Sequence, residues 1–405
     1  MPGIFGAIDP VRQHDWERLG QNVLALLGHQ PWYGTALRTE DTACLGAVAT
    51  SPHFAAERYF ATNERCSLIV EGHALAVDGE SLDPRTEVAA RLLDLYTKAG
   101  DAFIERVTGF FNLAIHHRHE SGLTVFNDRI AYGHLYYYHD GDFLLFAPEV
   151  KAFLAHPRLD KSLDEAGVAY FLAGHEGMIG DRTYLQKAKI LPAAAKLEYR
   201  NGKVTVSRYW RAEFRPDVTL NPDDIIDCCL DRYRRSLQAR LPAESYERIV
   251  VPLSGGLDSR LLTRLLCDQG RSPAELSLYT HGKPDSLDYR LARKVAAKLG
   301  LSDRHRLLEV HPDWLGENAL KSVWLTDGQF IFSNAYLIGI NEQLGPGRFP
   351  FVNGFIGSYL SLSARVTADD LLPLTDRAGL ADRVVAALSL PIGHAMLRFF
   401  LRDEV

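Results

Sequence analysis

Residues 251–260 read Val-Pro-Leu-Ser-Gly-Gly-Leu-Asp-Ser-Arg, and this stretch decides the fold of the C-terminal half of the chain. A β-type run that ends at Leu253 enters a Ser-Gly-Gly turn and continues into a leucine-rich helix. The two glycines let consecutive backbone N–H groups approach an anion, and the helix adds the positive end of its dipole. Ser254 and Ser259 can donate hydroxyl hydrogen bonds, while Asp258 offers oxygen ligands to Mg²⁺. The stretch therefore predicts a phosphate cradle.

Strands and helices alternate around this cradle. In chain order, the expected elements are a helix over 225–241, a strand over 249–253, a helix over 259–268, a strand over 276–280, a helix over 286–299 and a strand over 306–309. Such alternation implies right-handed crossovers and a parallel sheet that helices cover on both faces. Ligands of these sheets lie beyond the carboxyl ends of the strands, which is where the cradle is expected.

The first 150 residues have a different pattern, which is β-rich with two interspersed helices. Asp140-Gly141 supplies the positive φ values of a tight hairpin, and Gly100 stops a helix over 86–99. The expected strands are 3–8, 44–49, 68–71, 111–117, 123–127, 135–139 and 143–147. These pieces predict an antiparallel, sheet-rich domain with helices packed on it.

Composition places the chain among globular proteins of two or three domains. It has 405 residues with 46% hydrophobic content and a formal net charge of −6, so nucleic acid is not expected as an obligatory partner. The five cysteines are scattered and never spaced as C-x-x-C, which favours reduced thiols over zinc ligands. No segment approaches the roughly twenty apolar residues of a membrane span, and the first residues lack a signal-peptide pattern. We expect a cytoplasmic protein without a membrane partner.

With both halves in view, the chain resembles the asparagine synthetase family, which joins a glutamine-amidotransferase-like domain to an ATP-pyrophosphatase domain. The resemblance extends along nearly the entire sequence, and the order and spacing of its pieces make it specific. The segments that carry it are Met-Pro-Gly-Ile-Phe-Gly (1–6), Gly-Phe-Phe-Asn-Leu-Ala (109–114), Phe-Ala-Pro-Glu-Val-Lys-Ala-Phe-Leu (146–154), Leu191-Pro192, Tyr209-Trp210, Ser-Gly-Gly-Leu-Asp-Ser (254–259) and Asn-Gly-Phe-Ile-Gly-Ser (353–358).

This resemblance implies two domains of mixed α and β structure. The first, over 1–159, is an antiparallel sandwich of the N-terminal-nucleophile-hydrolase type. A connector over 160–215, with a helix over 163–172 and a hairpin at Asn201-Gly202, leads to a doubly wound parallel sheet of the ATP-pyrophosphatase type over 216–405. The family's C-terminal helical region carries a Lys that stabilises the adenylate, but no lysine follows Lys321 here. A truncated form and an incomplete catalytic apparatus both stay open, as does a homodimer.

The glutaminase half of the family pattern is broken at three places. Pro2 stands where the family has its nucleophilic Cys, and proline has no thiol. In the segment that matches the oxyanion hole, the acceptor-only Glu71 replaces an amide donor, and the segment that holds the glutamine amine reads Arg85-Thr86-Glu87. The chain therefore resembles the branch without the N-terminal Cys, such as β-lactam synthetases and lasso-peptide cyclases, and we expect no glutaminase activity.

The synthetase half keeps its nucleotide loop, so the resemblance implies ATP and Mg²⁺ as cofactors. The residues implied in cofactor binding are Leu253, Ser254, Gly255, Gly256, Leu257, Asp258, Ser259, Tyr279, Thr280, Gly354 and Gly357, with Asp258 as the metal ligand. The candidate catalytic residues are Asp258, Phe355 and Ser358. Ser358 falls where the family has a second Mg²⁺-binding Asp, and a hydroxyl is a poorer ligand. Asp285 or Asp288 could replace that ligand, although both are also explained as caps of the following helix.

These features predict an ATP-dependent amide-bond synthetase that adenylates a carboxylate and joins it to an amine or ammonia. Its substrates would be small molecules or peptides, and AMP and pyrophosphate would be released. The alternative is a degenerate protein that binds nucleotide or a partner without catalysis. Ser358 and Ile356, at positions where the family has Asp and Gly, favour this alternative, whereas the intact loop opposes it.

Two other groups of residues, a pair of histidines and an apolar run, are interpreted as parts of the fold. His117 and His119 share a strand face, but no carboxylate-rich segment accompanies them, which disfavours a metal site. Asp327 begins an apolar and aromatic run that is interpreted as packing against the sheet. Lining of the pocket for the amine acceptor is the other interpretation of that run.

Overall fold

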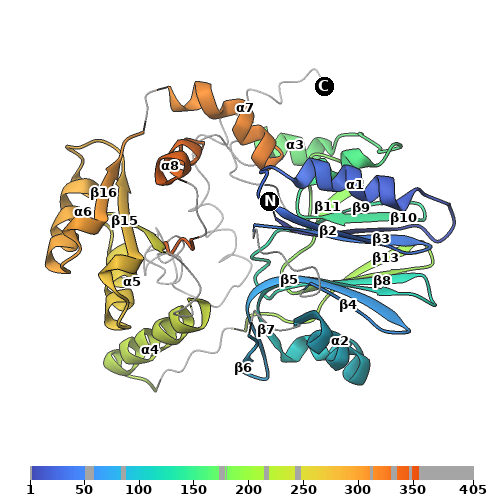
Figure 1. Ribbon diagram of the computed structural model, residues 1–405, viewed down its shortest axis with the longest axis horizontal. Helices are drawn as coiled ribbons and strands as arrows, with labels where there is room; N and C mark the ends of the chain where they lie inside the picture. The colour runs from blue at the N-terminus through green and yellow to red at the C-terminus, as the bar shows by residue number, and fades with distance from the viewer. Residues whose placement is uncertain are drawn as a thin grey trace, which may run out of the picture. The chain divides into compact units, whose positions relative to one another are not determined.

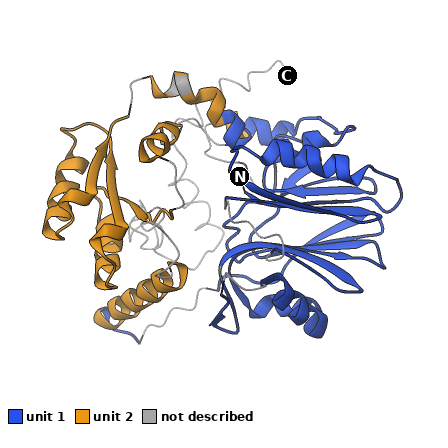
Figure 2. Cartoon of the chain, in the orientation of Figure 1, with its two compact units in different colours: residues 1–169, 177–222, 323–330 blue, residues 170–176, 223–322, 331–405 orange. Residues whose placement is uncertain are grey.

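The computed structural model describes residues 2–50, 59–83, 88–172, 178, 180–213, 219–241, 248–310, 313–329, 335–345 and 349–354. The chain divides into two compact units (Figure 2). Unit 1 comprises residues 1–169, 177–222 and 323–330, and unit 2 comprises residues 170–176, 223–322 and 331–405. Among the helices in the described ranges, none is long and apolar enough to cross a membrane.

Unit 1 contains two antiparallel sheets that pack face to face (Figure 1). The first has the strand order β11-β9-β10-β1-β3-β2, and the second has the order β13-β12-β8-β7-β5-β4 with β6 paired to β5. The strands are β1 (Gly3–Ile8), β2 (Gly34–Thr39), β3 (Ala43–Ala49), β4 (Phe60–Thr62), β5 (Cys66–Val77), β6 (Glu80–Ser81), β7 (Val107–His117), β8 (Gly122–Asn127), β9 (Tyr136–Asp140), β10 (Phe143–Ala147), β11 (Ala188–Ile190), β12 (Ala195–Arg200) and β13 (Lys203–Arg208).

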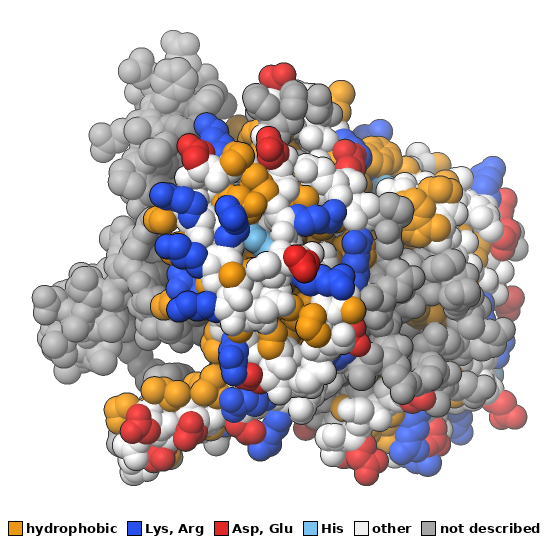
Figure 3. Space-filling view, turned by 60° about the vertical axis from the view of Figure 1, so that its left-hand side comes forward, with side chains coloured by type: hydrophobic (Ala, Val, Ile, Leu, Met, Phe, Trp, Pro, Cys, Tyr) orange, Lys and Arg blue, Asp and Glu red, His pale blue; other side chains and the backbone are white. Residues whose placement is uncertain are grey.

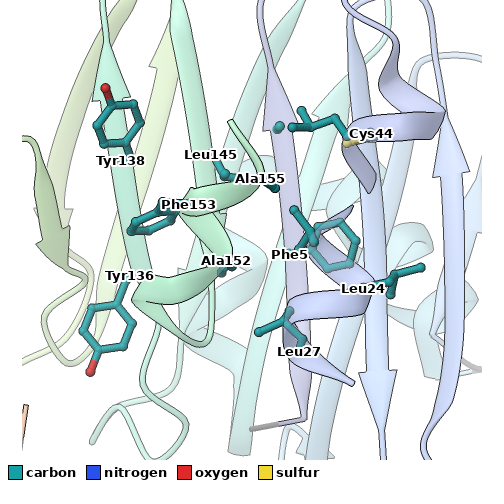
Figure 4. Packing of buried hydrophobic residues seen from close by; sticks show 14 of the residues in the cluster. Phe5, Leu24, Leu27, Cys44, Tyr136, Tyr138, Leu145, Ala152, Phe153 and Ala155 are labelled. Atoms are coloured by element: carbon teal, nitrogen blue, oxygen red, sulfur yellow. The ribbon is translucent and has the colours of Figure 1, made fainter. Parts of the chain in front are cut away.

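Side-chain alternation along the strands creates three apolar layers in unit 1. Ile4 and Ile8 of β1 point between the sheets, where they join Ile69 of β5 and other buried residues. On the other side of β1, Phe5 packs under α1 (Trp16–Leu27) and the 3₁₀ helix η3 (Val150–Ala155), as Figure 4 shows. The second sheet is covered by α2 (Val88–Ala99) and the 3₁₀ helix η2 (Gly100–Arg106). The expected sandwich with helices packed on it is confirmed.

The segment expected as a separate connector completes both sheets of unit 1 instead. After α3 (Glu165–Leu172), β11 pairs with β9 of the first sheet, while β12 pairs with β8 of the second. The predicted hairpin between β12 and β13 is present, with positive φ values at Asn201 and Gly202. Local turn signals revealed this hairpin, but its pairing with β8 is a long-range contact that those signals do not encode.

Unit 2 is built on a parallel sheet with the order β14-β15-β16, as the alternation of strands and helices predicted. Its strands are β14 (Ile249–Pro252), β15 (Leu276–His281) and β16 (His305–Leu308), and Phe351 pairs with Val250 on the free side of β14. Its helices are α4 (Pro222–Arg240), α5 (Leu257–Asp268), α6 (Leu287–Lys298), α7 (Trp314–Thr326) and α8 (Tyr336–Leu344), with short 3₁₀ turns at Pro273–Glu275 and Ser302–Arg304.

Helices cover both faces of the sheet in unit 2. Val251 and Leu278 pack against α4, α5 and α6 on one face. Val250 and Tyr279 pack against α8 on the other. The sheet is therefore buried on both sides, as a doubly wound fold requires. Its carboxyl edge leads directly into the Ser-Gly-Gly loop.

Candidate functional site

The loop between β14 and α5 is held in place by its own hydroxyl groups. The backbone N–H of Ser254 donates to Ser259 Oγ over 3.1 Å, and the Oγ atoms of the two serines are 3.0 Å apart. The N–H of Gly256 donates to Ser254 Oγ over 3.1 Å. Gly256 is the N-cap of α5 and provides no side chain to cap the helix. The positive end of this helix is thus presented at a loop of fixed shape, which suits an anion.

A carboxylate already uses one backbone donor of this loop. The N–H of Gly255 donates to Asp288 Oδ1 over 2.9 Å, and Asp288 lies in the first turn of α6. Asp288 is exposed, so its side chain can move away when a ligand arrives. Sequence reasoning considered Asp288 as a helix cap or a metal ligand, whereas Ser286 is the residue that caps α6, through the N–H of Tyr289. The N–H of Gly255 therefore already donates to a negatively charged group in the structure.

Asp258 is exposed in the first turn of α5, and no hydrogen bond or ion pair engages its carboxylate within the described part of the chain. A hard cation prefers such free carboxylate oxygens, so Asp258 fits the metal-binding role predicted for it. Among the described residues, no three His, Cys, Asp or Glu side chains gather into a group that could hold a metal ion. Mg²⁺ bound here would complete its coordination with phosphate oxygens and water.

A later segment of the chain lies directly on Asp258. Val250 of β14 donates to Pro350 O and accepts from the N–H of Val352, both over 2.9 Å. This pairing carries the chain to Gly354, where a Cβ would lie 2.6 Å from Asp258 Cβ and 3.1 Å from its carbonyl carbon. The structure thus brings the predicted Asn-Gly segment to the cradle, and only glycine fits there. Phe355, Gly357 and Ser358 lie outside the described residues.

Three of the positions implied in cofactor binding, Leu253, Tyr279 and Thr280, form a buried hydrogen-bonded row. Leu253 N donates to Tyr279 O over 2.8 Å, and Thr280 Oγ1 donates to Leu253 O over 2.6 Å. The side chains of Leu253, Tyr279 and Thr280 are all buried, whereas Leu257 is exposed. A nucleotide would therefore meet the first three residues through backbone atoms, and their role remains a prediction.

In unit 1, the place of the predicted oxyanion hole is rich in hydrogen-bond acceptors. Glu71 of β5 lies opposite Asn112 of β7. Burial raises the pKa of Glu71, the nearby Asp128 adds to the rise, and His73 opposes it. Asn112 Oδ1 has no hydrogen-bond partner, and Asn112 Nδ2 donates to Gly133 O over 3.1 Å. A carboxyl group thus stands at the position where the family pattern has an amide donor. Residues 85–87 lie outside the described residues.

A buried charged cluster in unit 1 was not foreseen from sequence. Asp327 accepts hydrogen bonds from the backbone N–H groups of Val150 over 2.6 Å and Lys151 over 3.3 Å, and pairs with Lys151 Nζ at 2.9 Å. Lys151 also pairs with Glu149, which bonds to His29 Nε2 at 2.8 Å. Asp327 therefore joins α7 to the segment at 149–151, whereas residues 330–334 of the apolar run that it begins lie outside the described residues. Glu149 and Lys151 belong to the segment 146–154, which carried the family resemblance. That resemblance was the one feature of the sequence that could have pointed to this cluster.

Two histidines of β7 form hydrogen bonds with side chains of neighbouring segments. His117 Nε2 bonds to Thr124 Oγ1 at 2.9 Å, and His116 Nδ1 bonds to Glu40 at 3.0 Å. Both side chains are buried. These bonds show the structural role of the two histidines in β7.

Family models match both halves of the chain. A glutamine amidotransferase domain model matches residues 73–210, and an asparagine synthase model matches residues 231–338. The chain is 26% identical over 209 residues to glutamine-hydrolysing asparagine synthetase 3 of Bacillus subtilis, which covers 51% of this chain and 32% of that protein. It is 26% identical over 259 residues to asparagine synthetase 2 of the same organism, which covers 59% and 33%.

A more distant curated relative is the amidase chyE of Penicillium rubens, 23% identical over 251 residues, covering 58% of this chain and 36% of that protein. The chain thus spans about a third of the length of the curated relatives it matches. Among solved structures, a glutamine phosphoribosylpyrophosphate amidotransferase of B. subtilis with ADP and GMP matches at a TM-score of 0.37 and 12% identity, covering 91% of this chain and 94% of that one.

Proposed function

Because this chain belongs to the asparagine synthetase family, we propose that it is an ATP-dependent carbon–nitrogen ligase that adenylates a carboxylate and joins it to an amine. The substrate carboxylate attacks the α-phosphate of ATP and releases pyrophosphate, and the amine then displaces AMP from the acyl-adenylate. The observation that carries this proposal is the open cradle at 254–259, in which an exposed, uncommitted Asp258 follows a glycine loop at the amino end of a helix.

The residues of the cradle would act by position and charge. Ser254 and Ser259 hold the loop in one shape through their mutual bonds, so the backbone donors are arranged before the nucleotide binds. Gly255 N–H would donate to a phosphate oxygen once Asp288 has moved away. Asp258 would hold Mg²⁺, which neutralises charge on the departing pyrophosphate when it is bound. The cradle therefore fits a reaction in which pyrophosphate is the leaving group.

We further propose that glutamine does not supply the nitrogen. Pro2 offers no thiol at the nucleophile position, and Glu71 replaces the amide donor in the segment that matches the oxyanion hole. The amine would come from the substrate itself, from a second substrate or from free ammonia. Ring closure of a small molecule or a peptide is one form of this reaction. Glutamate release above the buffer background would contradict this part of the proposal.

Pyrophosphate release from ATP tests the ligase proposal. The full chain is incubated with Mg²⁺, ATP and panels of carboxylates and amines, and pyrophosphate–ATP exchange is followed for each carboxylate. We expect release that depends on substrate and is abolished in Asp258→Ala. The matched control is Asp268→Ala at the other end of α5, where the carboxylate pairs with Arg264 at 2.8 Å. Equal activity in wild type and Asp258→Ala would refute the assignment of the cradle.

A second candidate function is nucleotide binding without catalysis. It is favoured by Ser358 and Ile356, which stand where the family has Asp and Gly. In that case calorimetry would show Mg²⁺-dependent ATP binding that Asp258→Ala removes, while no substrate yields pyrophosphate. Under the ligase proposal, Ser358→Asp should strengthen metal binding and raise pyrophosphate release. The two candidates therefore give opposite results in one set of proteins.

A further inference from the structure

Helix α6 carries a row of like charges on its exposed side. Arg290, Arg293, Lys294 and Lys298 are spaced at i, i+3 and i+4, and all four side chains are exposed. Like charges at this spacing destabilise a helix. None of the four forms an ion pair with a carboxylate of the described residues. The repulsion among these four side chains therefore lowers the stability of α6 when no ligand is bound.

Other helices in the described ranges place acids beside their cations. On α2, Lys98 pairs with Asp94 at 2.7 Å, and on α4, Arg235 pairs with Asp231 at 2.7 Å. The one acid within α6 is Asp288, and its carboxylate is bonded to the Ser-Gly-Gly loop. The cations of α6 are therefore left available for an anion from outside the chain.

Arg290, Arg293 and Lys294 border a hollow of about 610 Å³ between α6 and the start of β16. Among the described residues, its polar lining consists of Tyr289, Arg290, Arg293, Lys294, Ser302 and His305, without a carboxylate. Figure 3 shows this side of unit 2 with Lys and Arg side chains gathered on its surface. Small-molecule sites in proteins have volumes of roughly 300–1,000 Å³, so the hollow is large enough for a metabolite.

Two aromatic rings give the hollow a fixed wall. Thr280 Oγ1 donates its proton to Leu253 O, so the bond of 2.8 Å between Thr280 Oγ1 and His305 Nε2 must be donated by the histidine. This bond fixes the tautomer and orientation of His305. The ring of Tyr289 lies 5.5 Å from that of His305, and Arg293 lies 5.8 Å from the centre of the Tyr289 ring. The wall is therefore rigid, while the cations at its rim can adjust to a ligand.

We propose that this hollow binds a small ligand with at least two negative charges, carried by phosphate or carboxylate groups. Arginine and lysine side chains converge on it, and guanidinium groups bind both kinds of anion through paired hydrogen bonds. The site is a second one, separate from the nucleotide cradle, because none of the residues of 254–259 lines it. A long polyanion is disfavoured because the net charge of the whole chain is −6.

Calorimetric titration of the full chain in the absence of Mg²⁺ tests this inference. The probes are inorganic pyrophosphate for phosphate groups and citrate for carboxylate groups. In Arg293→Ala/Lys294→Ala, the affinity for at least one probe should fall tenfold or more. Lys298→Ala, a cation on the same helix that does not line the hollow, should change it less than twofold. Ser254→Ala should also leave this binding event unchanged, which distinguishes it from binding at the nucleotide cradle.

The double variant removes like-charge repulsion from α6, so we expect it to fold, and a thermal unfolding curve verifies this. Binding by one probe alone would identify the anionic group that the hollow prefers. The proposal is overturned if neither probe binds, if the double variant binds as wild type does, or if Lys298→Ala loses as much affinity. Binding of heparin without binding of either small probe would indicate a surface for macromolecules and would equally overturn it.

Discussion

Replacing Asp288 by Asn should tighten the binding of ATP in the absence of Mg²⁺. In the structure the Asp288 carboxylate accepts the N–H of Gly255, one of the donors that a phosphate group needs. ATP must displace this carboxylate and then bind beside its negative charge. Asn keeps the shape of the side chain but removes the charge, so the competition weakens.

The size of the effect follows from two contributions. A hydrogen bond to a charged group contributes about 1.5–3 kcal/mol and a neutral one about 1 kcal/mol, so the competing bond weakens by about 1 kcal/mol. Because Asp288 is exposed, its repulsion of a phosphate about 4 Å away is close to the value in water, about 1 kcal/mol. Together these amount to about 2 kcal/mol, which corresponds to a decrease in Kd of roughly thirtyfold. The loss of an acid from the first turn of α6 costs about 0.3–1 kcal/mol of stability.

The assay is calorimetric titration of ATP with EDTA present, and again with Mg²⁺, on wild type, Asp288→Asn and Asp285→Asn. The Asp285 variant makes the same charge change just before α6 and should alter Kd less than twofold. Unchanged or weaker binding in Asp288→Asn without Mg²⁺ would refute the reasoning. Weaker binding only with Mg²⁺ would identify Asp288 as the second metal ligand, which the sequence left as an alternative.

Three further perturbations follow from the packing. Gly354→Ala places a methyl group against backbone, so ATP affinity measured by calorimetry should fall at least tenfold, whereas Gly316→Ala, in open space on α7, should leave it unchanged. Asp327→Asn keeps the left-handed backbone but removes the charge that pairs with Lys151, so urea unfolding should show a loss of about 2 kcal/mol in unit 1; wild-type stability would contradict the role of the cluster. Burial, together with the Lys151 charge, lowers the pKa of His29 to about 4. Because the unfolded chain takes up this proton first, stability should fall as pH drops from 6.5 to 4, by at most about 3 kcal/mol; His29→Gln should flatten this dependence, and an unchanged profile would show that another group causes it.

Much of the architecture could be predicted because its signals are local. The strands β1 and β10 have the predicted bounds, and the elements from α4 to β16 begin and end within a few residues of those expected, whereas α7 and α8 were not predicted. Strand β2 was missed because it is a half-exposed edge strand with polar residues at both ends. Helix α1 was not located either, although Asp15 caps it and its apolar face packs on the first sheet.

The sequence by itself determined the two kinds of sheet and the position of the Ser-Gly-Gly loop between a strand and a helix. Alternation of side chains, turn residues and helix periodicity are properties of neighbouring residues, so they are visible without the fold. It also determined which residue types are present at each family position, including Pro2 and Glu71.

Only the tertiary structure decided which distant groups meet. It placed Asp288 on the N–H of Gly255 and Gly354 on Asp258. It also joined Asp327 to Val150, 177 residues earlier in the chain. Each of these contacts depends on how whole strands and helices pack, because a hydrogen bond or a close approach requires its two atoms to lie within about 3 Å. No local pattern encodes that distance, since it results from the register of the sheets and the burial of their apolar faces.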